Sequence, residues 1–284
     1  MNALALTLML ITTISWALAQ VISKLALDKI DVLTFNAVRA STALSMAILF
    51  VLFTGDLVNP GLGFLFFAVL AGIIGRFISV QLFFYLMKKD LAHRVMSISN
   101  SYPLWSVVLA ILFLGEEPSV VVLMAATLVV VGAYFLSSSR GKSSNWSLLT
   151  VTMAFLVAII WGSMIVINKY CLGGMTANTL LLILSTTGAV SCNAAMVAHI
   201  KSRLEFDKRS VGLAMLSGVI GLFVGEILSY FALRIEKASV LAPVLGALIP
   251  FGFLLSVLLL KERPSKKAIF GMLIVFLSVV LVSL

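Results

Sequence analysis

The sequence predicts an all-α integral membrane protein, with ten transmembrane helices arranged as two inverted five-helix repeats around a central cavity. Hydrophobic residues make up 62% of the chain and charged residues only 11%, whereas soluble domains carry about 25% charged residues. The apolar residues gather in ten runs, each close to the roughly 20 residues that a helix needs to cross a bilayer. Motifs of the first half also recur in the second half. These three observations place the chain in a membrane and divide it in two.

The ten expected spans are apolar runs bounded by charged residues, prolines and glycines. In the first half they cover about residues 3–24, 32–54, 61–87, 94–114 and 119–137. In the second half they cover about residues 147–168, 176–200, 210–233, 239–260 and 267–284. The serine-rich stretch between the halves is polar and lies at the midpoint of the chain. We therefore expect a first repeat over 1–137, a cytoplasmic linker over 138–146 and a second repeat over 147–284.

Motifs recur at a nearly constant spacing of 145 or 146 residues, which indicates an internal repeat. The recurring pairs are Trp16 with Trp161, Lys24 with Lys169, Gly72-x-x-Gly75-x-Phe77 with Gly218-x-x-Gly221-x-Phe223, Lys88 with Arg234, and LFLGEEPS (112–119) with LLLKERPS (258–265). A unit of five helices ends on the opposite side of the bilayer from where it begins. The second copy is therefore expected to be inverted, as in many secondary transporters.

The distribution of charge gives the expected orientation, because cytoplasmic loops of membrane proteins are rich in lysine and arginine. Ten spans place fifteen of the twenty basic residues on one side and three on the other, with Arg39 and Arg76 inside spans. The side with fifteen is predicted to be cytoplasmic. The chain is therefore expected in the cytoplasmic (inner or plasma) membrane, with both termini extracytoplasmic, and its net charge of +9 needs no nucleic acid to explain it.

The repeated turn, LGEEPS and LKERPS, is expected to join the fourth and fifth helices of each repeat. Glu116 and Glu262 are predicted to accept hydrogen bonds from free amides at the start of the following helix, where Pro118 and Pro264 lie. Inversion explains why only the second copy carries bases, since that copy would face the cytoplasm.

The repeated residues also resemble those of a known family. WALAQVISK (16–24), WGSMIVINK (161–169), FNAVR (35–39) and the segments from Pro103 to LGEEPS and from Pro250 to LKERPS resemble motifs of the EamA-type transporters of the drug/metabolite transporter superfamily. The resemblance covers essentially the whole chain and implies ten helices in two EamA repeats. It departs at Ala17, where the family has glycine, and the second repeat has no counterpart of Arg39. The family moves diverse metabolites and drugs, mostly outward in prokaryotes, so the resemblance implies export without naming a substrate.

Other function classes find no support in the residues. The sequence has no His-Glu-x-x-His, Cys-x-x-Cys, nucleophile elbow or phosphate-binding glycine loop, so we expect no enzyme activity, catalytic residue, metal or cofactor. His93 and His199 are interpreted as interfacial residues, and Cys171 and Cys192 as packing residues. A basic face interleaved with aromatic residues is also missing, which argues against nucleic acid. Without a nucleotide-binding motif, the energy for transport is expected to come from a gradient.

Glu226 is the acid within a span and the leading candidate for the chemistry of the site. A carboxylate there costs about 2.5–3.5 kcal/mol on insertion scales, so it needs a substrate cation, a proton or a structural base. Tyr230 lies one turn further on the same helical face. Arg76, in the symmetry-related third span, is expected to bind the carboxylate of a zwitterion whose ammonium group Glu226 holds. The alternatives are a direct pair with Glu226, or extension of Arg76 to the membrane surface.

Further substrate-binding candidates lie in neighbouring spans. They are Trp16 and Gln20 in the first span, Gln81 and Tyr85 in the third, Asn100 and Tyr102 in the fourth, and Trp161 in the sixth. Prolines interrupt the fourth and ninth spans, and each frees a carbonyl that must face protein or water. We therefore expect broken helices near the midplane, and a cavity lined by the first, third, fourth, sixth, eighth and ninth spans.

The predicted function is secondary active transport of a small organic metabolite by alternating access, in the export direction and with proton coupling at Glu226. The solute is expected to be an amino acid, a related amine or zwitterion, or a drug-like molecule. An uncoupled facilitator and a non-transport, lipid-interacting membrane subunit remain alternatives. The expected partners are the small-molecule substrate and membrane lipid, and the chain is expected to act as a monomer or a homodimer.

Overall fold

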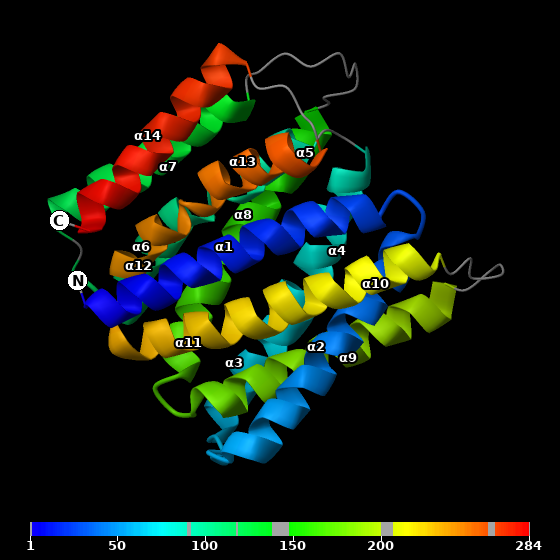
Figure 1. Cartoon of the computed structure of the whole chain (residues 1–284). Helices are drawn as coiled ribbons and strands as arrows, with labels where there is room; N and C mark the ends of the chain where they lie inside the picture. Colours follow the sequence, from blue (N-terminus) through cyan, green and yellow to red (C-terminus); the bar gives the residue numbers. More distant parts are fainter. Residues whose placement is uncertain are drawn as a thin grey trace.

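The computed structural model describes residues 2–89, 92–117, 119–137, 148–199, 207–260 and 265–283, and every regular element in these ranges is a helix. The predicted linker 138–146 lies outside the described residues, as do Pro118 and, in the second repeated turn, residues 261–264. Figure 1 shows the helices gathered in one bundle, with α7 and α14 side by side along one edge. Helix α1 begins and α14 ends at the same end of this bundle (Figure 1).

The helical elements follow the order of the expected spans. The first half contains α1 (Ala3–Ala26), α2 (Val32–Thr54), α3 (Leu62–Ala71), the π-helical segment η1 (Gly72–Ile78), α4 (Ser79–Lys89), α5 (Ala92–Ser99), α6 (Tyr102–Leu114) and α7 (Val120–Ser137). The second half contains α8 (Leu148–Cys171), α9 (Ala177–His199), α10 (Lys208–Ser217), the π-helical segment η2 (Gly218–Gly225), α11 (Glu226–Ile235), α12 (Ala238–Leu245), α13 (Leu248–Leu260) and α14 (Lys266–Ser283). Polar side chains satisfy the free amides where several helices begin, as Asn2 does for α1, Asp31 for α2 and Asp207 for α10.

Seven helices among the described residues are long and apolar enough to cross a membrane. They cover Ala3–Ala26, Val32–Thr54, Leu62–Lys89, Leu149–Cys171, Ala177–His199, Lys208–Ile235 and Ala238–Leu259. The other three expected spans contain shorter apolar helices, at Tyr102–Leu114, Val120–Gly132 and Ile269–Ser278. The all-helical fold with several candidate spans is thus confirmed, and the full set of ten spans stays a prediction.

The outer surface of the bundle is apolar, as a lipid-facing surface should be. Phe53 is 88% exposed, Phe113 74% and Leu258 71%. Monomeric soluble proteins rarely expose so many large apolar side chains to water. The polar and charged groups that are buried lie inside the bundle instead.

Two structural irregularities recur at equivalent places in the two halves. The segments η1 and η2 begin at Gly72 and Gly218, which are 146 residues apart. The fourth span breaks between α5 and α6 at residues 100–101, and the ninth breaks between α12 and α13 at residues 246–247. The predicted helix breaks next to the prolines are therefore present. The π-helical segments were not predicted from the sequence motifs.

Helices of one half pack against helices of the other half. Helix α1 contacts α10, η2, α11 and α13, while its counterpart α8 contacts α3, η1, α4 and α6. Two further pairs, α2 with α9 and α7 with α14, join equivalent helices. This exchange of partners places the first helix of each half in the centre of the bundle.

Glycines permit the closest of these contacts. A Cβ atom on Gly218 would lie 2.4 Å from the backbone oxygen of Arg39, and one on Gly225 would lie 2.6 Å from the ring of Trp16. Helices α1, α2 and η2 can therefore approach to backbone distance only because these positions lack side chains.

The first copy of the repeated turn has a different partner from the one expected. Gly115 ends α6 in the left-handed conformation, with φ of 63°. The two carboxylate oxygens of Glu116 then accept hydrogen bonds from the amides of Ala238 (3.1 Å) and Ser239 (2.8 Å). Glu116 thus caps α12 of the other half instead of the helix that follows it in sequence, because the two halves exchange neighbours.

Candidate functional site

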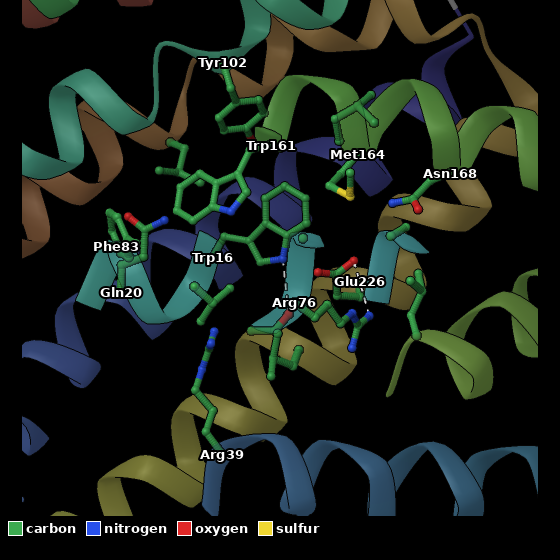
Figure 2. Close-up of a pocket in the computed structure, with 18 of the residues that line it drawn as sticks. Trp16, Gln20, Arg39, Arg76, Phe83, Tyr102, Trp161, Met164, Asn168 and Glu226 are labelled. Atoms are coloured by element: carbon green, nitrogen blue, oxygen red, sulfur yellow. Dashed lines mark hydrogen bonds and ion pairs between the residues drawn. The ribbon is translucent and has the colours of Figure 1, made fainter. Parts of the chain in front are cut away.

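A cavity of about 120 Å³ lies at the centre of the bundle and is lined by both halves of the chain (Figure 2). Its walls come from the six expected spans and also from α2 and α9, through Arg39 and Leu184. The space is somewhat smaller than the roughly 150 Å³ cavity that holds a benzene ring, so it suits a small organic solute of a few heavy atoms. The wall combines aromatic rings, aliphatic side chains and a few charged groups, which is typical of small-molecule sites.

Glu226 and Arg76 lie next to each other on the wall of this cavity. The Nη2 atom of Arg76 lies 3.6 Å from Oε2 of Glu226 and donates a hydrogen bond to the hydroxyl of Tyr230 at 2.9 Å. That hydroxyl in turn donates to Oε2 of Glu226 at 2.7 Å. Nη1 of Arg76 donates to Ser185 at 3.2 Å. The direct pair, one of the alternatives that the sequence leaves open, is therefore present, and Tyr230 bridges it.

The two expected tryptophans hold equivalent positions on the wall. The indole nitrogen of Trp16 donates to the backbone oxygen of Gly221 in η2, at 3.1 Å. The indole nitrogen of Trp161 donates to the hydroxyl of Ser79 at 2.9 Å, and that hydroxyl donates to the backbone oxygen of Gly75 in η1. A π-helix leaves carbonyls that its own ladder does not satisfy well, and each indole reaches one of them directly or through a hydroxyl.

Gln20 and Tyr102 line the cavity, whereas Asn100 does not and contacts Gln20 from behind the wall. Asn100 is fully buried, and its side-chain nitrogen donates to Oε1 of Gln20 at 3.0 Å. Tyr102 is 3% exposed, and its hydroxyl has no hydrogen-bond partner among the described residues. Asn100 therefore orients Gln20, while Tyr102 offers an unused polar group to the cavity.

Gln81 and Tyr85 do not line the cavity, in contrast to the prediction for the third span. Gln81 accepts a hydrogen bond from Asn36 at 2.8 Å, and Tyr85 is 45% exposed with the ammonium of Lys89 4.3 Å from its ring centre. Both residues follow η1, whose wider turn rotates the rest of the helix relative to a regular α-helix. Phe83 and Phe84 of α4 face the cavity in their place.

Two polar lining residues were not among the predicted substrate-binding residues. Arg39 of α2 was identified only as a base inside a span, yet its guanidinium reaches the cavity (Figure 2). Asn168 of α8 also lines it, and its Oδ1 atom is buried without a partner among the described residues. The signal for Arg39 was present in the sequence, since a base inside a span is expensive and marks a functional site by default.

The recurring lysines, Lys24 and Lys169, bind backbone carbonyls at helix C-termini and do not line the cavity. Lys24 of α1 donates to the backbone oxygen of Met87 near the end of α4. Lys169 of α8 donates to the backbone oxygens of Leu233 (2.6 Å) and Glu236 (2.9 Å) at the end of α11. Each lysine therefore satisfies carbonyls at the C-terminus of the third span of its own half.

The fold and the cavity define a multi-pass membrane protein with two related helical halves and a central solute-sized site. Residues 3–138 and 148–284 each match the EamA-like transporter family, and the chain belongs to that family. It is 25% identical over 229 residues to an uncharacterized transporter of Archaeoglobus fulgidus, and the match covers 76% of this chain and 75% of that protein. A protein of known crystal structure has the same fold, with a TM-score of 0.76 and 15% identity over 99% of this chain and 96% of that chain. The protein is thus a membrane transporter, as the sequence resemblance implies.

Proposed function

We propose that this transporter is a secondary exporter of a small organic metabolite, which it carries across the cytoplasmic membrane by alternating access with proton coupling at Glu226. The central cavity carries this proposal. Its walls come from both halves of the chain, so a relative movement of the halves would open it to one side of the membrane or the other. A bundle filled by side chains would favour the alternative of a non-transport membrane subunit.

The proposed architecture has ten spans in two inverted repeats, with both termini extracytoplasmic. The exchanged packing of α1 and α8, the equivalent positions of η1 and η2, and the equivalent breaks in the fourth and ninth spans support it. In this architecture α5 with α6, α7 and α14 complete the set of ten. A cytoplasm-active reporter fused after residue 284 should stay inactive, and an active reporter would contradict the orientation.

Proton coupling is assigned to Glu226 because of its contacts. Its side chain is 17% exposed, lines the cavity, and lies between Arg76 and Tyr230. Protonation would remove the charge that balances Arg76, which must then find another partner. Glu226 can therefore couple a change of charge to a change in the contacts between η1 of one half and α11 of the other.

The test is gradient-driven transport by the purified protein in proteoliposomes. The probe is a pool of isotope-labelled amino acids, amines and hydroxy acids, with a proton gradient imposed across the membrane and the movement of each solute followed by mass spectrometry. We expect Glu226→Gln to fold and to lose gradient-driven transport, while the control Glu117→Gln, at an exposed acid in the turn after α6, keeps it. Normal transport by Glu226→Gln would overturn the coupling assignment, and transport that persists when the gradient is collapsed would indicate a facilitator.

A further inference from the structure

The charges that line the cavity do not balance. Arg39, Arg76 and Glu226 are its charged lining residues among those described, which leaves one net positive charge when all three are ionised. Glu226 is committed to Arg76 by the 3.6 Å ion pair and by the hydroxyl of Tyr230 that bridges them. The uncompensated charge therefore belongs to Arg39.

Arg39 has few protein partners for a buried charge. It is 7% exposed, its Nε donates to the hydroxyl of Ser217 at 3.0 Å, and its guanidinium lies 5.2 Å from the ring centre of Phe84. In the described ranges, the ion pair of Arg76 with Glu226 is the salt bridge that the structure shows, and no carboxylate lies within 4 Å of Arg39. A guanidinium that has left water without a counterion is costly, so a mobile anion in the cavity would stabilise it.

Unsatisfied polar atoms lie on the opposite wall. The hydroxyl of Tyr102 and Oδ1 of Asn168 are both buried and without partners in the part of the chain that the structure describes. Buried polar groups are rarely left unpaired, and an orphaned pair in a cavity indicates a bound molecule that completes them. Figure 2 shows Arg39 rising from α2 on one side of the Trp16 indole, with Tyr102 beyond the Trp161 indole and Asn168 to the right of both indoles, past Met164.

We propose that the transported solute is a small organic carboxylate whose carboxylate binds the guanidinium of Arg39 and whose hydroxyl, or another hydrogen-bonding group, binds Tyr102 and Asn168. The planar fork of arginine matches two carboxylate oxygens, and the indoles between the two ends fit an apolar body. This inference rests on the proposed function and narrows its substrate class from metabolites in general to monoanions. The inside-negative membrane potential favours outward movement of an anion, which agrees with export.

The experiment measures the thermal unfolding temperature of the full-length protein in detergent with a series of matched solutes. The series is γ-hydroxybutyrate, butyrate, γ-hydroxybutyramide, γ-aminobutyrate and γ-aminobutyramide, with chloride and inorganic phosphate as simple anions. A ligand that binds only the folded state raises this temperature. We expect γ-hydroxybutyrate, whose hydroxyl and carboxylate lie at opposite ends of an apolar body, to raise it by about 5 °C near saturation, and the neutral γ-hydroxybutyramide to leave it unchanged.

Variants at Arg39 and at Tyr102 test whether the rise in unfolding temperature depends on these two parts of the cavity wall. Arg39→Gln should abolish the carboxylate shift, Arg39→Lys should weaken it, and the exposed control Arg209→Gln should preserve it. Tyr102→Phe removes an unpaired hydroxyl, so we expect it to keep the stability of the ligand-free protein and to erase the advantage of γ-hydroxybutyrate over butyrate. The Tyr102→Phe measurement decides the question even where Arg39→Gln does not fold.

Several results would overturn the proposal. These are equal stabilisation by acids and amides, stabilisation by the cationic γ-aminobutyramide alone, full stabilisation by chloride or phosphate, no shift with any carboxylate, or a carboxylate shift that survives Arg39→Gln. Transport of a neutral or cationic solute would leave the exporter assignment intact and defeat the carboxylate inference. If carboxylates bind at Arg39 but the protein transports no solute, the carboxylate site is supported and the proposed transport function is contradicted.

Discussion

Trp16 and Trp161 lie 145 residues apart in sequence, and each indole donates a hydrogen bond toward the π-helical segment of the opposite half. Trp16 reaches the backbone oxygen of Gly221 directly, at 3.1 Å, whereas Trp161 reaches Gly75 through the hydroxyl of Ser79. The two tryptophans thus connect the halves on either side of the cavity. The small difference between the two arrangements has a measurable consequence.

Replacing each tryptophan with phenylalanine should have unequal effects on stability. Trp16→Phe deprives the Gly221 carbonyl of its indole donor, and we expect a loss of about 1–2 kcal/mol in unfolding free energy. Trp161→Phe leaves the Ser79 hydroxyl bonded to Gly75, so the loss should be smaller. Chemical unfolding in mixed micelles measures both, and a larger loss for Trp161→Phe would contradict the assigned hydrogen bonds.

Breaking the ion pair at the cavity should cost more than removing it as a unit. Arg76→Met leaves the Glu226 carboxylate without its base, and we expect a loss of about 3 kcal/mol. The double variant Arg76→Met/Glu226→Gln should be more stable than Arg76→Met alone, because no unpaired charge remains. Additive single effects in the same unfolding assay, within about 0.5 kcal/mol, would mean that the two side chains are not coupled.

The eighth span offers a matched pair of glycines for testing the close helix contact. A Cβ at Gly218 would meet the backbone oxygen of Arg39 at 2.4 Å, whereas one at Gly212 would meet nothing within 4 Å. Gly218→Ala should therefore lower the unfolding temperature by several degrees. Gly212→Ala should raise it slightly, since alanine is favoured over glycine in a helix by about 0.5–1 kcal/mol. Equal effects would show that α2 and η2 do not touch in the folded protein.

Acid should weaken the contact between the start of α1 and the end of α11. Partial burial opposes ionisation of Glu236, but hydrogen bonds from the amides of Asn2 and Lys237 outweigh it, so the pKa of Glu236 is lowered. A lowered folded-state pKa gives stabilisation that is present above the unfolded-state pKa of about 4.3 and is lost as the pH falls through the folded-state value.

The measurement is the unfolding temperature between pH 7 and pH 3 for the wild type and Glu236→Gln. The wild type should be the more stable of the two at pH 7, and the difference should shrink as the pH falls below about 4.3. A difference that stays constant over this range would show that the Glu236 carboxylate does not stabilise the fold through its charge.

Much of the fold was predictable, because bilayer thickness sets the length of the apolar runs and membrane orientation sets the distribution of basic residues. The apolar runs indicated the helices, the spacing of Trp16 and Trp161 indicated the repeat, and prolines indicated the helix breaks. The proximity of Arg76 and Glu226 followed from symmetry, although the residues alone did not decide between a direct pair and two ends of a zwitterion site.

The wall of the cavity was less predictable, because it depends on how each helix is rotated against its neighbours. Gln81 and Tyr85 follow η1, and the i→i+5 bonds of a π-helix shift the face on which later residues lie. Arg39 lines the cavity because Gly218 lets η2 approach α2 at that level, a contact between distant segments. Glu116 reached α12 for a similar reason, since the halves exchange neighbours.

The central claim is that the cavity opens to both sides of the membrane in turn, and cysteine accessibility tests it without a known substrate. Asn168→Cys, in a chain with Cys171→Ala and Cys192→Ala, places a thiol on the cavity wall. A membrane-impermeant maleimide should label it when added to either side of sealed vesicles, while a control cysteine at fully buried Ala158 should stay unlabelled. Labelling from one side only, or from neither side, would contradict alternating access through this cavity.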